Sequence, residues 1–446
     1  MKKVRLLSFA ALGLLSLTAC ATNGGGEDSG DKEPYADAVK VGLICLHDEN
    51  STYDANFING LKEAVKILGR KVIFEDNCLL TGVDEDNACY TAAKDLVNKG
   101  CEVIFADSFG HDSFMLQAAQ EYPDVQFCHA TGTKSTVNED QENFHNAFAS
   151  IYQGRYLAGY TAGLKLYEQN VVAGKTAADF PKEKVGYVGA FPYAEVKSGY
   201  TSWFLGLRQA LEDNDVDSSK VTMDVRFTSS WYDPEAEANA ATALINDGAV
   251  LVSQHADSMG APGVCEEKGI PNVTYNVETG DECQTTYLAY SRINWAPYYE
   301  GIVNAVYAAK TGIADGRIAG NWTGTLGTDS VQYNVNWDNL TDNADRLEGY
   351  KAKVATVYNK LFAGDLQVFE TSKFTLDADY AEDIGAVLDE DGHVTSYKAD
   401  VIDDGTFTGE TEAIVTNEDD VTYFCESVFR SAPYFDLNIE GINLKN

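Results

Sequence analysis

The sequence alternates short apolar strands with amphipathic helices, and it runs through this order twice. In the first half, Val41–Leu46 is typical of a buried strand and is followed by a polar loop and a helix. In the second half, Val185–Ala190 begins the same succession. A helix, a glycine and an apolar strand recur together in Asp95–Ala106 and in Ala243–Ser253. This alternation predicts an α/β fold with two lobes, each a parallel sheet with helices on both faces.

Two such lobes side by side form a cleft between them. Open α/β sheets bind ligands beyond the carboxyl ends of their strands, so we expect the loops at these ends to line the cleft. The loops at these ends hold many aromatic, amide, histidine and carboxylate side chains. Any one loop is also compatible with a plain solvated turn, but six at matching positions favour a ligand cleft. The six loops are His47–Asp54, Asp107–His111, His129–Gly132, Phe191–Val196, Gln254–Ser258 and Asn276–Glu278.

The N-terminal residues are typical of an exported protein. Three cationic residues precede the apolar run Leu6–Leu17, which is too short for an ordinary membrane span. Leu17–Cys20 matches the cleavage site of bacterial lipoproteins, so we expect residues 1–19 to be a signal peptide and Cys20 to carry lipid. The alternative is a plain signal peptide with a coincidental cysteine. Residues 20–38 are rich in Gly, Asp and Glu and predict a flexible linker, with the folded part at the extracytoplasmic face of the cell membrane.

The chain carries 33 Lys plus Arg against 69 Asp plus Glu, a formal net charge of −36. A surface this acidic repels phosphate backbones, so we expect no nucleic-acid partner. The six histidines show no H-E-x-x-H spacing and the cysteines form no C-x-x-C pair, so we expect no metal and no cofactor. His255 and Asp257 could support proton transfer, but no nucleophile motif accompanies them, and an enzyme is not favoured.

Nine cysteines include Cys20, which leaves an even number that could pair in an exported chain. Cys78 and Cys89 flank a polar stretch, and we expect this pair to form a local disulfide. Cys45 and Cys128 lie at or beside apolar strands, where buried free thiols are common.

Several stretches together resemble the basic membrane protein (BMP) family, the substrate-binding lipoproteins of ABC importers whose characterised members bind purine nucleosides. The matching stretches are Val41–Leu61, Phe148–Gly163, Val185–Gly206, Trp231–Asp257 and Leu361–Phe369. The resemblance implies a type I periplasmic-binding-protein fold of two Rossmann-like lobes with an interlobe cleft. We expect lobe 1 to comprise residues 39–150 plus about 285–318, and lobe 2 residues 151–284 plus about 319–446.

The resemblance also implies ligand contacts. Counting back from Gly60, Asn50 and Tyr53 match positions in the family's first loop, where an aromatic side chain stacks on the base. The acidic residue that holds the sugar hydroxyls in the family falls near Asn276 and Glu278, and a cationic contact falls near Arg292.

The residues themselves point to the same cleft, because aromatic rings can stack on a flat heterocycle and amides and carboxylates can orient it. Sugar-binding sites use the same side-chain types, so these residues do not separate a nucleoside from a sugar. Trp231 is equally compatible with a packed core position. The candidate ligand contacts are Asn50, Tyr53, Ser108, Phe109, Phe191, Trp231, Gln254, His255, Asp257, Asn276, Glu278 and Arg292.

We therefore expect a binding protein that closes on a small, nucleoside-like solute and delivers it to an ABC permease, while attached to the membrane by its lipid anchor. Two alternatives remain open. One is a secreted enzyme that processes nucleosides or sugars in the same cleft, and the other is a ligand-sensing surface receptor on the same fold.

Overall fold

The computed structural model describes residues 36–402 and 409–445. The expected signal peptide, the expected lipidation site Cys20 and most of the expected linker lie outside the described residues. No helix within the described ranges is long and apolar enough to cross a membrane.

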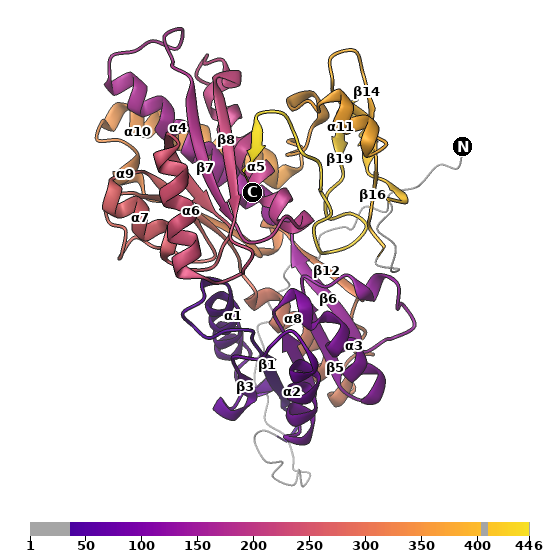
Figure 1. The fold of residues 1–446 in the computed structure, drawn as a ribbon. Helices are drawn as coiled ribbons and strands as arrows, with labels where there is room; N and C mark the ends of the chain where they lie inside the picture. Colours follow the sequence, from indigo (N-terminus) through magenta and orange to yellow (C-terminus); the bar gives the residue numbers. More distant parts are fainter. Residues whose placement is uncertain (1–35, 403–408, 446) are drawn as a thin grey trace, which may run out of the picture. The chain divides into compact units, whose positions relative to one another are not determined.

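Lobe 1 is built on a sheet in which every pair of neighbouring strands is parallel. Its strands are, in spatial order, β12 (Asn321–Gly324), β6 (Phe144–Ala149), β5 (Gln126–Ala130), β4 (Val103–Ala106), β1 (Val39–Ile44) and β2 (Val72–Ile73), with β3 (Leu79–Leu80) also paired to β1. Its helices are α1 (Thr52–Leu68), α2 (Asn87–Asn98), α3 (Asp112–Glu121) and α8 (Ala296–Thr311). Helix α1 packs on α8, and α2 packs on α3 (Figure 1).

Lobe 2 is built on a second sheet, parallel except at one edge, where β13 runs antiparallel to β11. Its strands are β13 (Val331–Val335), β11 (Tyr287–Ile293), β10 (Asn272–Tyr275), β9 (Ala249–Gln254), β7 (Glu183–Gly189), β8 (Val221–Phe227) and β20 (Ile442–Leu444). Its helices are α4 (Ile151–Val172), α5 (Ala194–Glu212), α6 (Pro234–Asn246), α7 (Gly260–Lys268), α9 (Trp337–Leu340) and α10 (Ala344–Ala363). The expected α/β fold with two largely parallel sheets is confirmed.

The chain passes between the lobes three times, after Ala149, after Ile293 and after Gly324. The last two crossings differ from the expected boundaries near residues 285 and 318. Strand β11 belongs to the second sheet and β12 to the first, because β11 pairs with β10 and β12 pairs with β6. In each case the chain adds one more strand to the sheet of the lobe it is in before it crosses to the other lobe. The pattern of helices in the sequence does not reveal these added strands.

Helices α4 and α5 approach each other closely because small residues line their contact. A Cβ atom added at Gly159 would lie 1.8 Å from the carbonyl oxygen of Trp203, and one at Gly206 would lie 2.0 Å from that of Tyr156. Only glycine allows this approach. Helix α4 also packs on β10, β11 and β13 of the second sheet, and α5 begins at Ala194 on the cavity wall, so this packing helps to fix the start of α5 beside the cavity.

The C-terminal segment, from 364 to 445, folds onto both lobes. It contains α11 (Ala378–Asp383) and three short hairpins, β14 (Val387–Leu388) with β15 (Val394–Ser396), β16 (Lys398–Ala399) with β17 (Thr411–Glu412), and β18 (Ile414–Thr416) with β19 (Thr422–Phe424). Its core is aromatic, with Phe369 stacked on Phe435 at a centroid distance of 4.2 Å. The Ser431 hydroxyl donates to Oδ1 of Asn321, the first residue of β12, at 3.2 Å, which ties the segment to lobe 1.

The eight cysteines in the described residues are free and buried. The expected pairing of Cys78 with Cys89 is wrong in this structure. Cys78 instead faces Cys101, with 3.7 Å between the two sulfur atoms, and Cys89 Sγ lies 3.9 Å from the carbonyl oxygen of His111. The two residues flank a polar stretch of the chain, but a 3₁₀ turn at residues 76–78 places Cys78 beside Cys101, just before β4.

Candidate ligand-binding site

A cavity of about 300 Å³ is lined by loops that follow the strands of both sheets. Lobe 1 contributes Leu46, His47, Tyr53, Asp54, Ser108, Phe109, Thr131 and Thr133. Lobe 2 contributes Tyr193, Ala194, Glu195, Trp231, His255 and Asp257. The C-terminal segment contributes Asp400, Arg430, Ala432 and Pro433. The cavity therefore lies at the carboxyl ends of the strands, the place where parallel sheets bind ligands.

Aromatic rings from both lobes form one wall of the cavity. The rings of Phe109 and Tyr193 contact each other across the two lobes, with centroids 5.5 Å apart. Trp231 follows at 6.0 Å from Tyr193. Phe191 is behind them, 5.1 Å from Tyr193 and 5.0 Å from Trp231. Rings held in this way present flat faces to a ligand, and a planar heterocycle can stack on them.

Tyr53 places a further ring at the lobe 1 side of the cavity. It stands in the first turn of α1, whose N-terminus is capped by Ser51. Its hydroxyl donates to the carbonyl oxygen of Asp107 at 2.9 Å, and its ring packs against Phe57 at 4.9 Å between centroids. These two contacts fix the ring, so it needs no ordering when a ligand arrives.

Asp54 is an ionised hydrogen-bond acceptor on the same wall. Its carboxylate accepts from the backbone N–H of His47 at 2.8 Å and from the Ser51 hydroxyl, and His47 Nδ1 lies 3.6 Å away. Burial by itself would raise the pKa of Asp54, but the bonds from His47 and Ser51 outweigh it and hold the pKa below its ordinary value.

Asp107 lies directly behind Asp54 and differs from it in protonation. Its side chain is fully buried and accepts from the backbone N–H of Leu46 at 3.2 Å. Burial, followed by the charge of Asp54, raises the pKa of Asp107 well above its ordinary range. The pKa values of the two neighbouring carboxyl groups are thus shifted in opposite directions, which favours the ionised form of Asp54 and the protonated form of Asp107.

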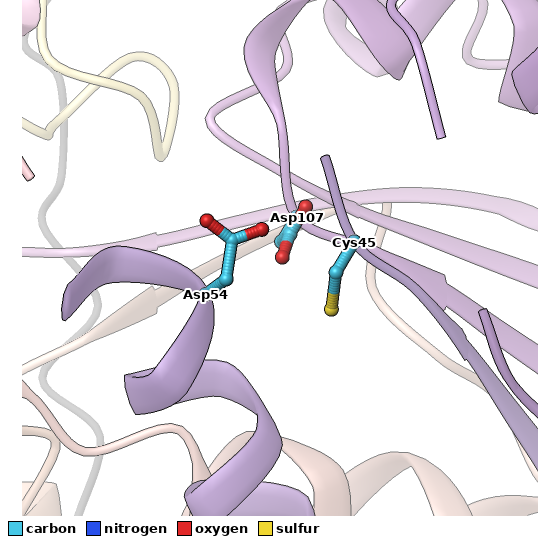
Figure 2. Close-up of side chains that lie close together, drawn as sticks. All are labelled: Cys45, Asp54 and Asp107. Atoms are coloured by element: carbon cyan, nitrogen blue, oxygen red, sulfur yellow. The ribbon is translucent and has the colours of Figure 1, made fainter. Parts of the chain in front are cut away.

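The same two residues and Cys45 are the cluster that could hold a metal ion among residues 36–402 and 409–445. One ligand atom from each lies within 4.8 Å of the others, and Figure 2 shows the three side chains close together. Burial raises the pKa of the Cys45 thiol, which favours the neutral thiol in the absence of a metal.

Asp257 is the main polar group that lobe 2 places beside lobe 1. Its backbone oxygen accepts from the N–H of Thr52, the first residue of α1, at 2.8 Å, and this contact joins the two lobes. Its carboxyl group accepts from Asn276 Nδ2 at 3.4 Å. Burial first, and then the charge of Glu237, raises the pKa of Asp257 well above its ordinary range. The protonated form is favoured, and it can donate to a ligand as well as accept from it.

Six of the residues predicted from the sequence lie on the cavity wall: Tyr53, Ser108, Phe109, Trp231, His255 and Asp257. The others do not line it. Phe191, Gln254 and Asn276 lie one layer behind: Gln254 Nε2 donates to the carbonyl oxygens of Ala256 and Ser258, which fixes the loop that carries His255. Their direct contact with a ligand stays a prediction.

Three further predicted residues are not among those that line the cavity, and their contact with a ligand stays a prediction. Asn50 is exposed and bonds to Asp48 at 2.8 Å. Glu278 is exposed, and Arg292 donates to Gln332 at 2.9 Å across the β11–β13 pair. Alignment by counting along the chain placed these residues near the strand ends, but their side chains follow the local turn and the antiparallel edge strand.

Sequence reasoning missed Asp54, Tyr193 and Glu195, although the loops that contain them were identified. Strand-end position marks a loop, and it does not tell which of its side chains turns inward. Arg430 and Asp400 gave no signal, because the segment that carries them has no regular apolar period.

The family model described as "ABC transporter substrate-binding protein PnrA-like" (Bmp) matches residues 43–281. The chain belongs to this family. It is 32% identical over 271 residues to a purine-binding protein of Brucella abortus (strain 2308). The aligned region covers 60% of this chain and 69% of that protein. It is 28% identical over 278 residues to a putative ABC transporter glucose-binding protein of Haloferax volcanii, covering 62% of this chain and 61% of that protein.

Solved structures agree on the fold. An ABC transporter solute-binding protein from Aeropyrum pernix K1 aligns with a TM-score of 0.57 and 14% identity, over 78% of this chain and 96% of that one. The chain therefore has the fold of the type I periplasmic binding proteins. Members of the family are solute-binding proteins of ABC transporters and work outside the cytoplasm. The family match ends at residue 281, so the C-terminal segment at the cavity lies beyond it.

Proposed function

We propose that this family member binds a purine nucleoside in the cavity between its lobes and delivers it to an ABC permease. The observation that carries the proposal is the pairing of aromatic rings with carboxyl groups on the walls of one cavity of about 300 Å³. This volume is at the lower end for small-molecule sites, which suits a base or a nucleoside. Stacking of one base on an aromatic side chain contributes about 1–3 kcal/mol.

The carboxyl groups favour a neutral ligand that carries hydrogen-bond donors. Asp54, Glu195 and Asp400 line the cavity together with one guanidinium group, that of Arg430, and with Asp257, for which the neutral carboxyl form is favoured. A phosphate group would meet more negative than positive charge there, so nucleotides should bind less well than nucleosides. Purine N–H groups and ribose hydroxyls are donors of the required kind.

Ligand binding would favour the closed arrangement of the lobes. Contacts that join them at the cavity include the hydrogen bond from Thr52 to Asp257 and the ring contacts of Phe109 with Tyr193 and of His47 with Tyr232. A ligand that touches both walls strengthens this arrangement by its differential contacts. The closed form is the one that docks on the permease, and the Cys20 lipid anchor would keep it at the membrane.

Calorimetry of the purified protein with nucleosides, bases, nucleotides and glucose tests the proposal. We expect one equivalent of a purine nucleoside to bind without turnover and to raise the melting temperature. Binding of glucose with no response to any purine would overturn it. Release of a free base from a bound nucleoside, followed by chromatography, would instead support the alternative of a nucleoside-processing enzyme.

A further inference from the structure

A buried cation lies behind the cavity without a carboxylate beside it. Arg155, on helix α4, is fully buried, and no ion pair joins it to a carboxylate in the described part of the chain. Its Nη1 donates to the carbonyl oxygen of Gln254 at 3.1 Å, and its guanidinium carbon lies 3.7 Å from the centroid of the Tyr275 ring. A buried charge needs such partners, and a third one, His255, connects it to the cavity.

His255 receives a hydrogen bond from Arg155 on one side and meets Glu195 on the other. Arg155 Nη2 lies 2.9 Å from His255 Nδ1, and His255 Nε2 lies 2.8 Å from Glu195 Oε2. A guanidinium group only donates, so Nδ1 must be the acceptor and the ring proton must be on Nε2. The direction of the chain of bonds is therefore fixed: Arg155 donates to His255, and His255 donates to Glu195.

The surroundings keep the imidazole of His255 neutral and in place. Burial first, and the nearby charge of Arg155 as well, lowers the pKa of His255, against the opposing effect of Glu195. The ring packs on Tyr275 with centroids 4.9 Å apart. Gly199 on α5 leaves the room for it, because a Cβ atom there would come within 3.0 Å of His255 Nδ1.

Glu195 is the last residue of this chain of hydrogen bonds, here called the Arg155–His255–Glu195 relay, and it lies on the cavity wall. One of its oxygens accepts from His255, and a carboxylate has acceptor capacity for further donors. We propose that Arg155 and His255 are positioning residues that hold Glu195 as an obligatory hydrogen-bond acceptor, so that the solute must present an N–H or O–H donor at this point. The inference rests on the proposed function, in that the cavity is the solute site, and it adds which chemical group the solute must carry.

The relay predicts a specific effect of Glu195→Gln. The substituted amide must still accept from His255, because the ring can only donate there. Its NH2 group then faces the ligand, so the variant offers a donor where the wild type offers an acceptor. A carboxylate with a merely structural role would give no such change in ligand preference.

Four probes test this: adenosine, purine riboside without the 6-amino group, 2′-deoxyadenosine and 3′-deoxyadenosine. Each of the three analogues lacks one hydrogen-bond donor of adenosine. We expect the wild type to bind one of them about tenfold more weakly than adenosine, namely the analogue that lacks the donor to the Glu195 carboxylate. Glu195→Gln should lose about tenfold for adenosine and nothing for that analogue. Glu267→Gln, an exposed carboxylate on α7 that does not line the cavity, is the matched control and should bind all four like the wild type. Equal losses for all four probes in Glu195→Gln, or equal wild-type affinity for all four, would overturn the inference.

The imidazole itself gives a second, independent readout. In ¹⁵N-histidine NMR spectra, His255 should be neutral with its proton on Nε2, and Arg155→Lys should keep this signature while Arg155→Met should lose it. A protonated ring, or a proton on Nδ1 in the wild type, would overturn the relay. If the wild type bound no purine riboside, the proposed function would fail, and the NMR signature would still decide whether the relay exists.

Discussion

Tyr53 separates the two roles that an aromatic residue can have in this cavity. Its ring lines the wall, whereas its hydroxyl donates away from the ligand, to the carbonyl oxygen of Asp107 at 2.9 Å. Tyr53→Phe keeps the ring and removes the hydrogen bond, which should lower the free energy of unfolding by about 1 kcal/mol. Because the hydroxyl is engaged within lobe 1, the affinity for a purine nucleoside should change by less than about threefold.

Tyr53→Ala removes the stacking face as well. Loss of one stacked base contact of about 2 kcal/mol corresponds to a weakening of about thirtyfold. The neighbouring ring of Phe57, at 4.9 Å between centroids, stays in place and keeps the start of α1 packed. The variant should therefore remain folded.

Isothermal titration calorimetry gives both affinities, and urea unfolding gives both stabilities. The reasoning predicts that affinity follows the ring and stability follows the hydroxyl. It would be refuted if Tyr53→Phe lost as much affinity as Tyr53→Ala, or if Tyr53→Ala bound a purine nucleoside like the wild type.

Three other predictions concern the cavity, the acid stability and the helix contact. Asp257→Ala should weaken ligand binding about tenfold in calorimetry, whereas Asp257→Asn, which mimics the protonated carboxyl group, should stay near the wild type. Burial lowers the pKa of His111 from 6.5 to about 4, so the stability that its neutral ring contributes is complete above pH 6.5 and is lost as the pH falls toward 4, about 3 kcal/mol in all. Urea unfolding from pH 4 to 7.5 should show a shallower acid loss in His111→Gln, and an unchanged slope would count against this assignment. Gly206→Ala places a Cβ atom 2.0 Å from the Tyr156 carbonyl oxygen and should cost about 1–3 kcal/mol or more in denaturant unfolding, whereas Gly301→Ala, with nothing within 4 Å, should be neutral or slightly stabilising.

The layers of the fold could be predicted from the sequence because the signal for them is local and repeated. Val41–Leu46 and Val185–Ala190 are apolar runs of strand length, and each is followed by a helix of the expected period. The exchange of β11 and β12 between the sheets could not be predicted. Which sheet a strand joins depends on its pairing partner, β10 or β6, far away in the sequence.

Part of the site could be predicted from the sequence for a related reason. Parallel strands bring their following loops to one edge, so position along the chain was sufficient to locate the loops. The inward-facing side chains depend on local turns. Tyr193 and Glu195 line the cavity while Phe191 packs behind, although the three lie within five consecutive residues at the start of α5. Arg155 gave no sign of its role, because its connection to the cavity exists only in the folded chain, where it reaches Gln254 at the end of β9 and His255 next to it.

Trp231 offers the most direct test of whether a purine ring binds between the lobes. Among the five tryptophans of the chain, it is the one on the cavity wall in the described residues. Titration with a purine nucleoside should quench tryptophan fluorescence at one equivalent, and Trp231→Phe should abolish the quenching while calorimetry still shows binding. Full quenching in Trp231→Phe, or a fluorescence response to glucose and to no purine, would contradict the account.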